Sequence, residues 1–110
     1  MRYTLPKEAE QPADVQEVIR LVRHTFPNIN WTRLWVSHPG ADDDGLWFFW
    51  LPNEAGDVRI ESSFGICPFD VATDKHNENF IGNNVSEVAA KTIEWLALPG
   101  GSFESFWHPR

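Results

Sequence analysis

Six consecutive apolar residues, Leu46 to Leu51, constrain the fold of this chain more than any other segment. The run is short, rich in aromatic residues and bounded by turn-forming residues at 40–45 and 52–57, as is typical of a β-strand. Because successive side chains of a strand point to opposite faces, this strand is apolar on both faces. Both faces therefore need cover. We expect helices to cover one, and whatever covers the other is the best clue to function.

Length and composition indicate a single globular domain. A chain of 110 residues is predicted to form one domain, residues 1–110, that buries enough surface to fold without disulfides or metals. The hydrophobic fraction of 42% is typical of globular proteins, and six Trp and eight Phe predict an aromatic core.

The charge and the cysteine content limit the classes of partner and the compartment. A formal net charge of −7 opposes binding to nucleic acid or to anionic membranes, so neither is expected as a partner. A basic protein partner fits this charge, although an ordinary soluble bacterial domain can carry it too. A single cysteine, Cys67, allows no internal disulfide, and we see no signal peptide or membrane span. A cytoplasmic location is therefore predicted.

Two amphipathic helices are predicted, one on each side of the strand-forming region. Within residues 14–26, apolar side chains recur at helical spacing. A second helix is expected after Asn84, whose side chain can form a capping box with Glu87. The apolar stripe of this helix continues to Leu96.

Four strands are predicted between the helices, at residues 31–36, 46–51, 58–64 and 69–74. The turn-forming residues between them favour hairpins and hence an antiparallel meander. The order α-β-β-β-β-α predicts an α+β two-layer sandwich, in which a four-stranded antiparallel sheet carries the N-terminal and C-terminal helices on one face. An aromatic C-terminal tail, with Phe103, Phe106 and Trp107, follows.

Alternation assigns side chains to the two faces of this sheet. The face toward the helices is expected to carry Leu34, Val36, Val58, Ile60, Phe64, Phe69 and Val71. The opposite face is expected to carry one alternate set from Leu46–Leu51 together with Trp31, Arg33, Trp35, Arg59, Glu61, Asp70 and Ala72. Left bare, this second face is expected to expose more apolar area than monomers usually tolerate, so something should cover it.

The second face supplies most candidate residues for binding a partner or ligand: Trp31, Arg33, Trp35, Arg59, Glu61 and Asp70. Glu61 and Asp70, on neighbouring strands, have the chemistry of the paired carboxylates found in sugar-cleaving enzymes. The favoured interpretation is that Arg33 and Arg59 neutralise both carboxylates in a cross-strand charge network. Most X-Pro bonds are trans, and the same is expected at Pro68.

The remaining polar motifs predict no catalytic or metal site. The run Asp42, Asp43 and Asp44 lacks the alternate spacing and distal Glu of a calcium loop, so we interpret it as a solvated turn or, functionally, as a docking patch for Lys and Arg. The four histidines, His24, His38, His76 and His108, are dispersed along the chain. Cys67 has no base that the sequence identifies, so it is expected to be an ordinary buried thiol. No cofactor is predicted, and these observations favour a protein that is not an enzyme.

The stretch from Trp47 to Leu96 combines the bulky strand, the segment Arg59–Phe69 with its Gly-x-Cys-Pro-Phe core, and the helix start at Asn84–Val88. This pattern resembles small uncharacterised bacterial α+β proteins, some of them similar to immunity proteins that neutralise polymorphic toxins. The resemblance covers nearly half of the chain and implies a cytoplasmic, non-enzymatic inhibitor. It transfers no functional residue, and the tail from Gly100 onward is not part of it.

Four interpretations of the second face follow. The first is a non-enzymatic protein-binding module, most concretely an acidic immunity-like inhibitor of a basic toxin. The second is a small-molecule-binding protein or minor enzyme, in which Trp31 and Trp35 stack on a ring. The third is a structural homodimer that buries the face by self-association. In the fourth, the tail aromatics fold back and cover the face themselves.

Overall fold

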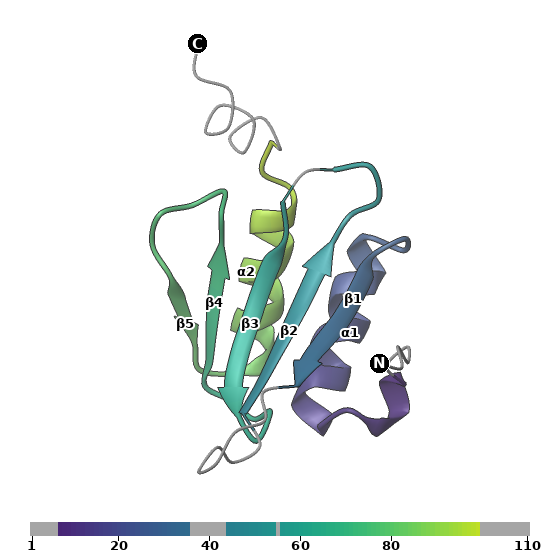
Figure 1. Ribbon diagram of the computed structural model, residues 1–110, viewed down its shortest axis with the longest axis vertical. Helices are drawn as coiled ribbons and strands as arrows, with labels where there is room; N and C mark the ends of the chain where they lie inside the picture. The colour runs from purple at the N-terminus through teal and green to yellow at the C-terminus, as the bar shows by residue number, and fades with distance from the viewer. Residues whose placement is uncertain (1–6, 36–43, 55, 100–110) are drawn as a thin grey trace.

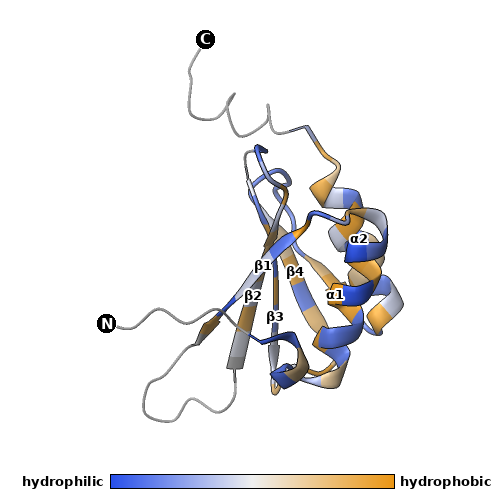
Figure 2. Cartoon of the chain, turned by 90° about the vertical axis from the view of Figure 1, so that its right-hand side faces the viewer, coloured by the Kyte–Doolittle hydropathy of each residue, from blue (hydrophilic) through white to orange (hydrophobic). Residues whose placement is uncertain are grey.

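The computed structural model describes residues 7–35, 44–54 and 56–99, which form a sheet and a helical layer (Figure 1). In chain order the elements are η1 (Glu8–Glu10), α1 (Ala13–Thr25), β1 (Asn30–Trp35), β2 (Asp44–Trp50), β3 (Val58–Ser63), β4 (Phe69–Thr73), β5 (Phe80–Gly82) and α2 (Val85–Leu96). The strands form one antiparallel meander in the order β1-β2-β3-β4-β5. Both helices lie on the same side of it (Figure 2). The predicted α+β class, meander and helix placement are therefore confirmed.

The prediction of four strands is wrong by one. β5 pairs with β4, so that Gly82 lies opposite Phe69 and Phe80 opposite Val71. Three residues are too few for a periodic pattern, and the sequence around them is polar. Gly82 allows α2 to approach closely, because a Cβ atom at this position would lie 2.6 Å from Cγ2 of Val88.

The helices begin close to the predicted residues. The Asn84 side chain accepts a hydrogen bond from the Glu87 amide at 2.9 Å, which confirms the predicted cap of α2. The Glu87 carboxylate in turn accepts from the amide of Asn83, one residue before the usual capping-box partner. α1 starts after Pro12. Neither α1 nor α2, the two α-helices of the described chain, has the length and apolar character that crossing a membrane requires.

The core lies between the helical layer and one face of the sheet. Its fully buried members are Val15, Val18, Ile19, Val22, Trp47, Phe49, Val58, Ile60, Phe69, Val71 and Val88. Val58, Ile60, Phe69 and Val71 lie on the predicted face. The two rings from β2 are the largest of these side chains, so the helix side of the apolar run is covered as expected.

Trp47 has a well-defined site within this core. Its indole N–H donates a hydrogen bond of 2.9 Å to Oε1 of Gln11, itself buried just before α1. The ring meets Phe69 edge-on and lies directly over Gly45, where a Cβ atom would approach the ring to 2.4 Å. The polar atom of this buried aromatic is therefore satisfied, as a buried indole requires.

The turn between β3 and β4 differs from the prediction. Phe64 was expected to continue the alternation of β3 toward the helices, but β3 ends at Ser63 and Phe64 adopts φ 62°, so its side chain is 52% exposed. Gly65 follows at φ 68° and packs so closely on Pro12 that a side chain would not fit. The peptide bond before Pro68 is cis, contrary to the expected trans form.

Candidate functional site: the open face of the sheet

The face of the sheet that points away from both helices is termed the open face. Residues paired across neighbouring strands share a face, so the strand registers define its members. They are Asn30, Thr32, Leu34, Leu46, Phe48, Trp50, Arg59, Glu61, Ser63, Asp70, Ala72 and Ile81. Figure 1 is viewed from this side, with the strands in front of both helices.

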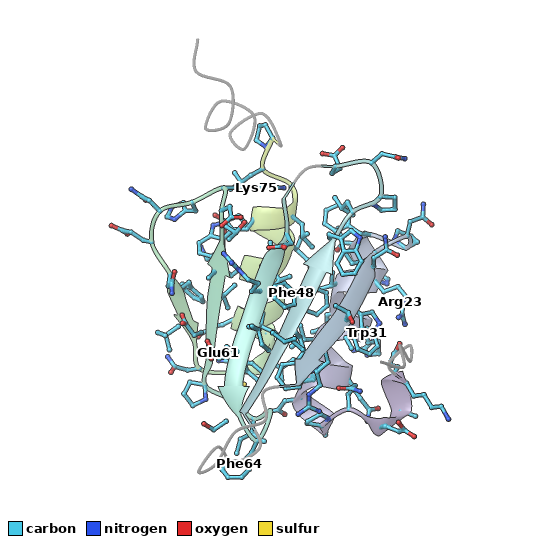
Figure 3. All side chains as sticks on the ribbon, in the orientation of Figure 1. Arg23, Trp31, Phe48, Glu61, Phe64 and Lys75 are labelled. Atoms are coloured by element: carbon cyan, nitrogen blue, oxygen red, sulfur yellow. The ribbon has the colours of Figure 1, made fainter. Side chains whose placement is uncertain are left out.

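An apolar stripe runs along β2 on the open face. It consists of Leu46, Phe48 and Trp50, which alternate with the buried Trp47 and Phe49. All three stripe residues are partly exposed, and none of them packs against the core (Figure 3 labels Phe48). The second face of the apolar run is thus not covered by the described residues.

Two carboxylates stand directly opposite each other beside the stripe. Glu61 on β3 pairs with Asp70 on β4 in the strand register, and we call them the acidic pair. Asn79 donates a hydrogen bond of 3.2 Å to Oδ2 of Asp70, whereas Oδ1 of Asp70 is buried and has no hydrogen-bond partner within the described chain. Like charges directly opposed across strands destabilise a sheet.

The predicted neutralisation of the acidic pair by Arg33 and Arg59 is wrong. Arg59 donates to Asp74 at 3.1 Å and lies 3.8 Å from Asp57, so its charge is directed along the sheet toward other carboxylates. In the described part of the chain, no Lys or Arg forms an ion pair with either member of the acidic pair. Burial raises the pKa of Asp57 even though Arg59 opposes that shift.

The acidic pair belongs to a row that crosses all five strands. Successive register partners place five side chains side by side: Leu34, Leu46, Glu61, Asp70 and Ile81. We call these five the mixed row. Its two ends, Leu34 and Ile81, are 50% and 54% exposed. Between them lies a depression of about 340 Å³, lined by Leu46, Arg59, Glu61, Asp70, Ala72 and Asn79.

Trp31 and Arg33 lie on the other face, so their predicted placement beside the acidic pair is wrong. β1 pairs with β2 in a register that places Trp31 opposite Phe49 and Arg33 opposite Trp47. Trp31 packs against the core, and the Arg33 guanidinium lies 4.6 Å from the Trp47 ring centroid, a cation–π contact. Leu34, expected among the helices, is exposed instead.

The two faces of β1 were assigned the wrong way round because neither face is clearly the more apolar. Both of its faces carry large apolar side chains, so alternation could not decide which one points inward. The bulkier indole of Trp31 extends the core, and the Arg33 guanidinium makes a cation–π contact with the Trp47 ring.

Several other predicted residues fall outside the part of the chain that the structure describes. Asp42, Asp43, Val36, His38 and His108 lie outside the described residues, as do the side chains of Trp35 and Asp44. His24 and His76 are exposed, and no cluster of three or more metal-ligating side chains occurs in the described part of the chain. Arg59, Glu61, Asp70 and Ala72 occupy the predicted face.

The surroundings of Cys67 favour the protonated form of its thiol. Burial, together with the nearby Asp14 carboxylate, raises the pKa of its thiol to about 11, so the thiol is protonated at neutral pH. Its amide also donates to the Asp14 carboxylate at 3.1 Å. These contacts hold the turn against α1, and Cys67 is partly buried rather than fully buried as expected.

The sequence interpretation missed Leu34 and Ile81 as members of the candidate site. Ile81 belongs to the short strand that escaped prediction. For Leu34 a signal was present, since Gly45 two residues before Trp47 leaves room for an indole on that face of β2 and favours Trp47 as the inward residue. With Trp47 directed inward, the pairing of β1 with β2 would have placed Leu34 on the open face.

The open face thus combines apolar side chains with carboxylates that no cation neutralises within the described chain. Such a surface can hold a cationic group whose surroundings are apolar. Comparisons with protein-family models, curated proteins and solved structures find no match to this chain. The resemblance to immunity proteins therefore stays a prediction.

Proposed function

We propose that this protein is a non-enzymatic protein-binding module that binds a basic partner through the open face. The observation that carries the proposal is the mixed row, in which an uncompensated acidic pair is flanked by exposed Leu34 and Ile81. Interfaces combine apolar anchors with complementary charge, which increases the association rate and excludes wrong partners. An immunity-like inhibitor of a basic toxin is the concrete biological form of this proposal.

The other interpretations have less support. Ring stacking on Trp31 requires that residue on the open face, and it lies on the other one. A homodimer through the open face would bring together two copies that each carry a formal charge of −7.

Capture of partners from cells that naturally express the protein tests the proposal. The bait is the full chain, compared with a Leu34→Asp/Ile81→Asp variant that makes both ends of the mixed row acidic. Ala90→Asp, on the exposed side of α2, is the matched control. We expect wild type and Ala90→Asp to retain one stoichiometric basic protein that the double variant loses. Retention by all three baits, or no stoichiometric partner, would contradict the proposal.

A further inference from the structure

We infer that the partner segment is an amphipathic α-helix with a basic flank, which lies along β2 and adds a third layer to the sandwich. This inference rests on the proposed function and specifies the chemistry that the open face recognises. Three features of the open face lead to it: the position of β2 inside the sheet, the spacing of the apolar stripe, and the one-sided placement of the acidic pair.

The position of β2 excludes strand addition over the stripe. β2 is hydrogen-bonded to β1 on one side and to β3 on the other, so the stripe offers side chains and no free backbone groups. An extended segment laid on the stripe would bury its own N–H and C=O groups without partners, which is costly. A helix satisfies these groups internally and is the element that normally covers a sheet face.

The spacing of the stripe fits the turns of a helix. Leu46, Phe48 and Trp50 occupy alternate positions of one strand, so neighbouring members are separated by roughly 6.6 Å and the whole stripe spans about 13 Å. A helix rises about 5.4 Å per turn, so apolar residues on three successive turns cover about the same length. The partner helix therefore needs one apolar face, roughly three turns long, directed at β2.

The charges around the stripe predict on which flank of the partner helix, and near which of its ends, the basic residues lie. On the β1 side the stripe is bordered by Thr32 and Leu34, which are uncharged. On the β3 side it is bordered by Glu61, next to Leu46, and by Arg59, next to Phe48. Because Arg59 is already engaged by Asp57 and Asp74, the acidic pair is the unpaired charge, and it lies at the Leu46 end.

Arginine meets the demands of this position best. Its long apolar stem can lie against Leu46 while its planar fork donates to two carboxylates at once. The Glu61 carboxylate is exposed and offers acceptor atoms directly, and Oδ1 of the neighbouring Asp70 is buried and lacks a donor in the described chain. Lysine offers the same charge but not the fork. The partner helix should therefore carry arginine on its β3-side flank, near the end that covers Leu46.

Synthetic helical peptides test this chemistry directly. The probe is roughly 18 residues long, which permits a substantial helix population, with Leu on three successive turns and Arg on one flank near one end. A second peptide has citrulline, a neutral isostere, at each Arg. A third has the same composition with the Leu positions scrambled. Affinities are measured by fluorescence anisotropy, and the binding surface is mapped by amide chemical shifts of the full-length protein.

We expect the Arg peptide to perturb the amides of β2 and of the mixed row. The citrulline peptide should bind about tenfold more weakly, because charge-assisted hydrogen bonds are lost, and the scrambled peptide should bind more weakly still. A Glu61→Gln/Asp70→Asn variant should lose about the same factor for the Arg peptide and nothing for the citrulline peptide. Glu10→Gln/Glu54→Gln, which removes two exposed charges elsewhere, is the matched control.

Orientation gives a second readout. With a paramagnetic label at the Arg end of the peptide, amide signals near Glu61 and Asp70 should broaden, and those near Asn30 and Trp50 should not. Equal binding of the Arg and citrulline peptides, shifts confined to the helix side, or the reverse broadening pattern would overturn the inference. If instead the cellular partner is lost on Leu34→Asp/Ile81→Asp while no peptide binds, the helix is wrong and the proposed function stands.

Discussion

The two faces of the sheet meet within a single strand and differ sharply. Along β2, Trp47 and Phe49 are fully buried on the helix side, whereas Phe48 and Trp50, of the same residue types, remain partly exposed on the open face. The polar atom of Trp47 has a hydrogen-bond partner in Gln11. The apolar residues of the open face therefore lie outside the core that the described residues form.

Charges follow the same division. On the helix side, the Arg33 guanidinium lies over the Trp47 ring and the aromatic face accommodates its charge. On the open face, Glu61 and Asp70 face each other with no cation between them in the described chain. The helix side thus gives Arg33 an aromatic contact, and the open face retains a charge that a partner can complement.

Truncation of neighbouring rings on β2 should give the largest contrast between the faces. Trp47→Ala is expected to lower the free energy of unfolding by about 3–5 kcal/mol, because it leaves a cavity and an unpaired Gln11 carbonyl. Phe48→Ala should cost about 1 kcal/mol or less, since its ring is not packed against the core. Urea denaturation measures both. Equal losses would mean that the open face is also an interior surface.

The reactivity of the Cys67 thiol tests how well this residue is shielded from solvent on the helix side of the sheet. Folding raises its pKa from 9.0 to about 11. The contribution of this thiol to the free energy of unfolding is therefore fully present below pH 9 and is lost as the pH rises through 11. Stability at pH 6–8 should therefore be insensitive to this group. At pH 8 the native thiol should react with iodoacetamide about a hundredfold more slowly than the thiol of the urea-unfolded chain. If the iodoacetamide reaction rate of the native protein, followed against pH, had its inflection below pH 9, the raised pKa of the Cys67 thiol would be contradicted.

Much of this fold could be predicted because local signals agreed with the tertiary structure. The Asn84 cap, the helical spacing within residues 14–26 and the turn residues around β2 all act over a few residues, and each element formed where expected. β5 was not predicted because its three residues are held by pairing with β4 and by contact with α2. Neither interaction leaves a local pattern in the sequence.

The candidate site was predictable only where alternation was unambiguous. β3 and β4 place aliphatic residues inside and charged residues outside, so Arg59, Glu61 and Asp70 fell on the expected face. In β1 both faces are bulky, and the choice depends on which residue meets Phe49 across the strand pair. That information resides in the register, a tertiary property, and the same error assigned Arg33 to the acidic pair.

Relief of charge on the open face should have a small stabilising effect. Glu61→Gln is expected to raise the free energy of unfolding by about 0.2–1 kcal/mol at low salt, because it removes a like-charge contact with Asp70. The gain should shrink as salt is added, since Glu61 is exposed. Glu10→Gln, in η1, is the control and should leave stability unchanged. A loss of stability in Glu61→Gln would show that a cation of this chain already neutralises the acidic pair.

Removal of residues 100–110 should have the smallest effect and is the strictest test of the contrast between the faces. We expect the chain ending at Pro99 to unfold with a free energy within about 0.5 kcal/mol of the full chain and to show unchanged amide shifts along β2. If Phe103, Phe106 and Trp107 covered the apolar stripe, their loss would cost about 3 kcal/mol or more and would perturb Phe48 and Trp50 directly. That outcome would make the open face a second core, supplied by the chain's own tail, and no surface for a basic helix would remain.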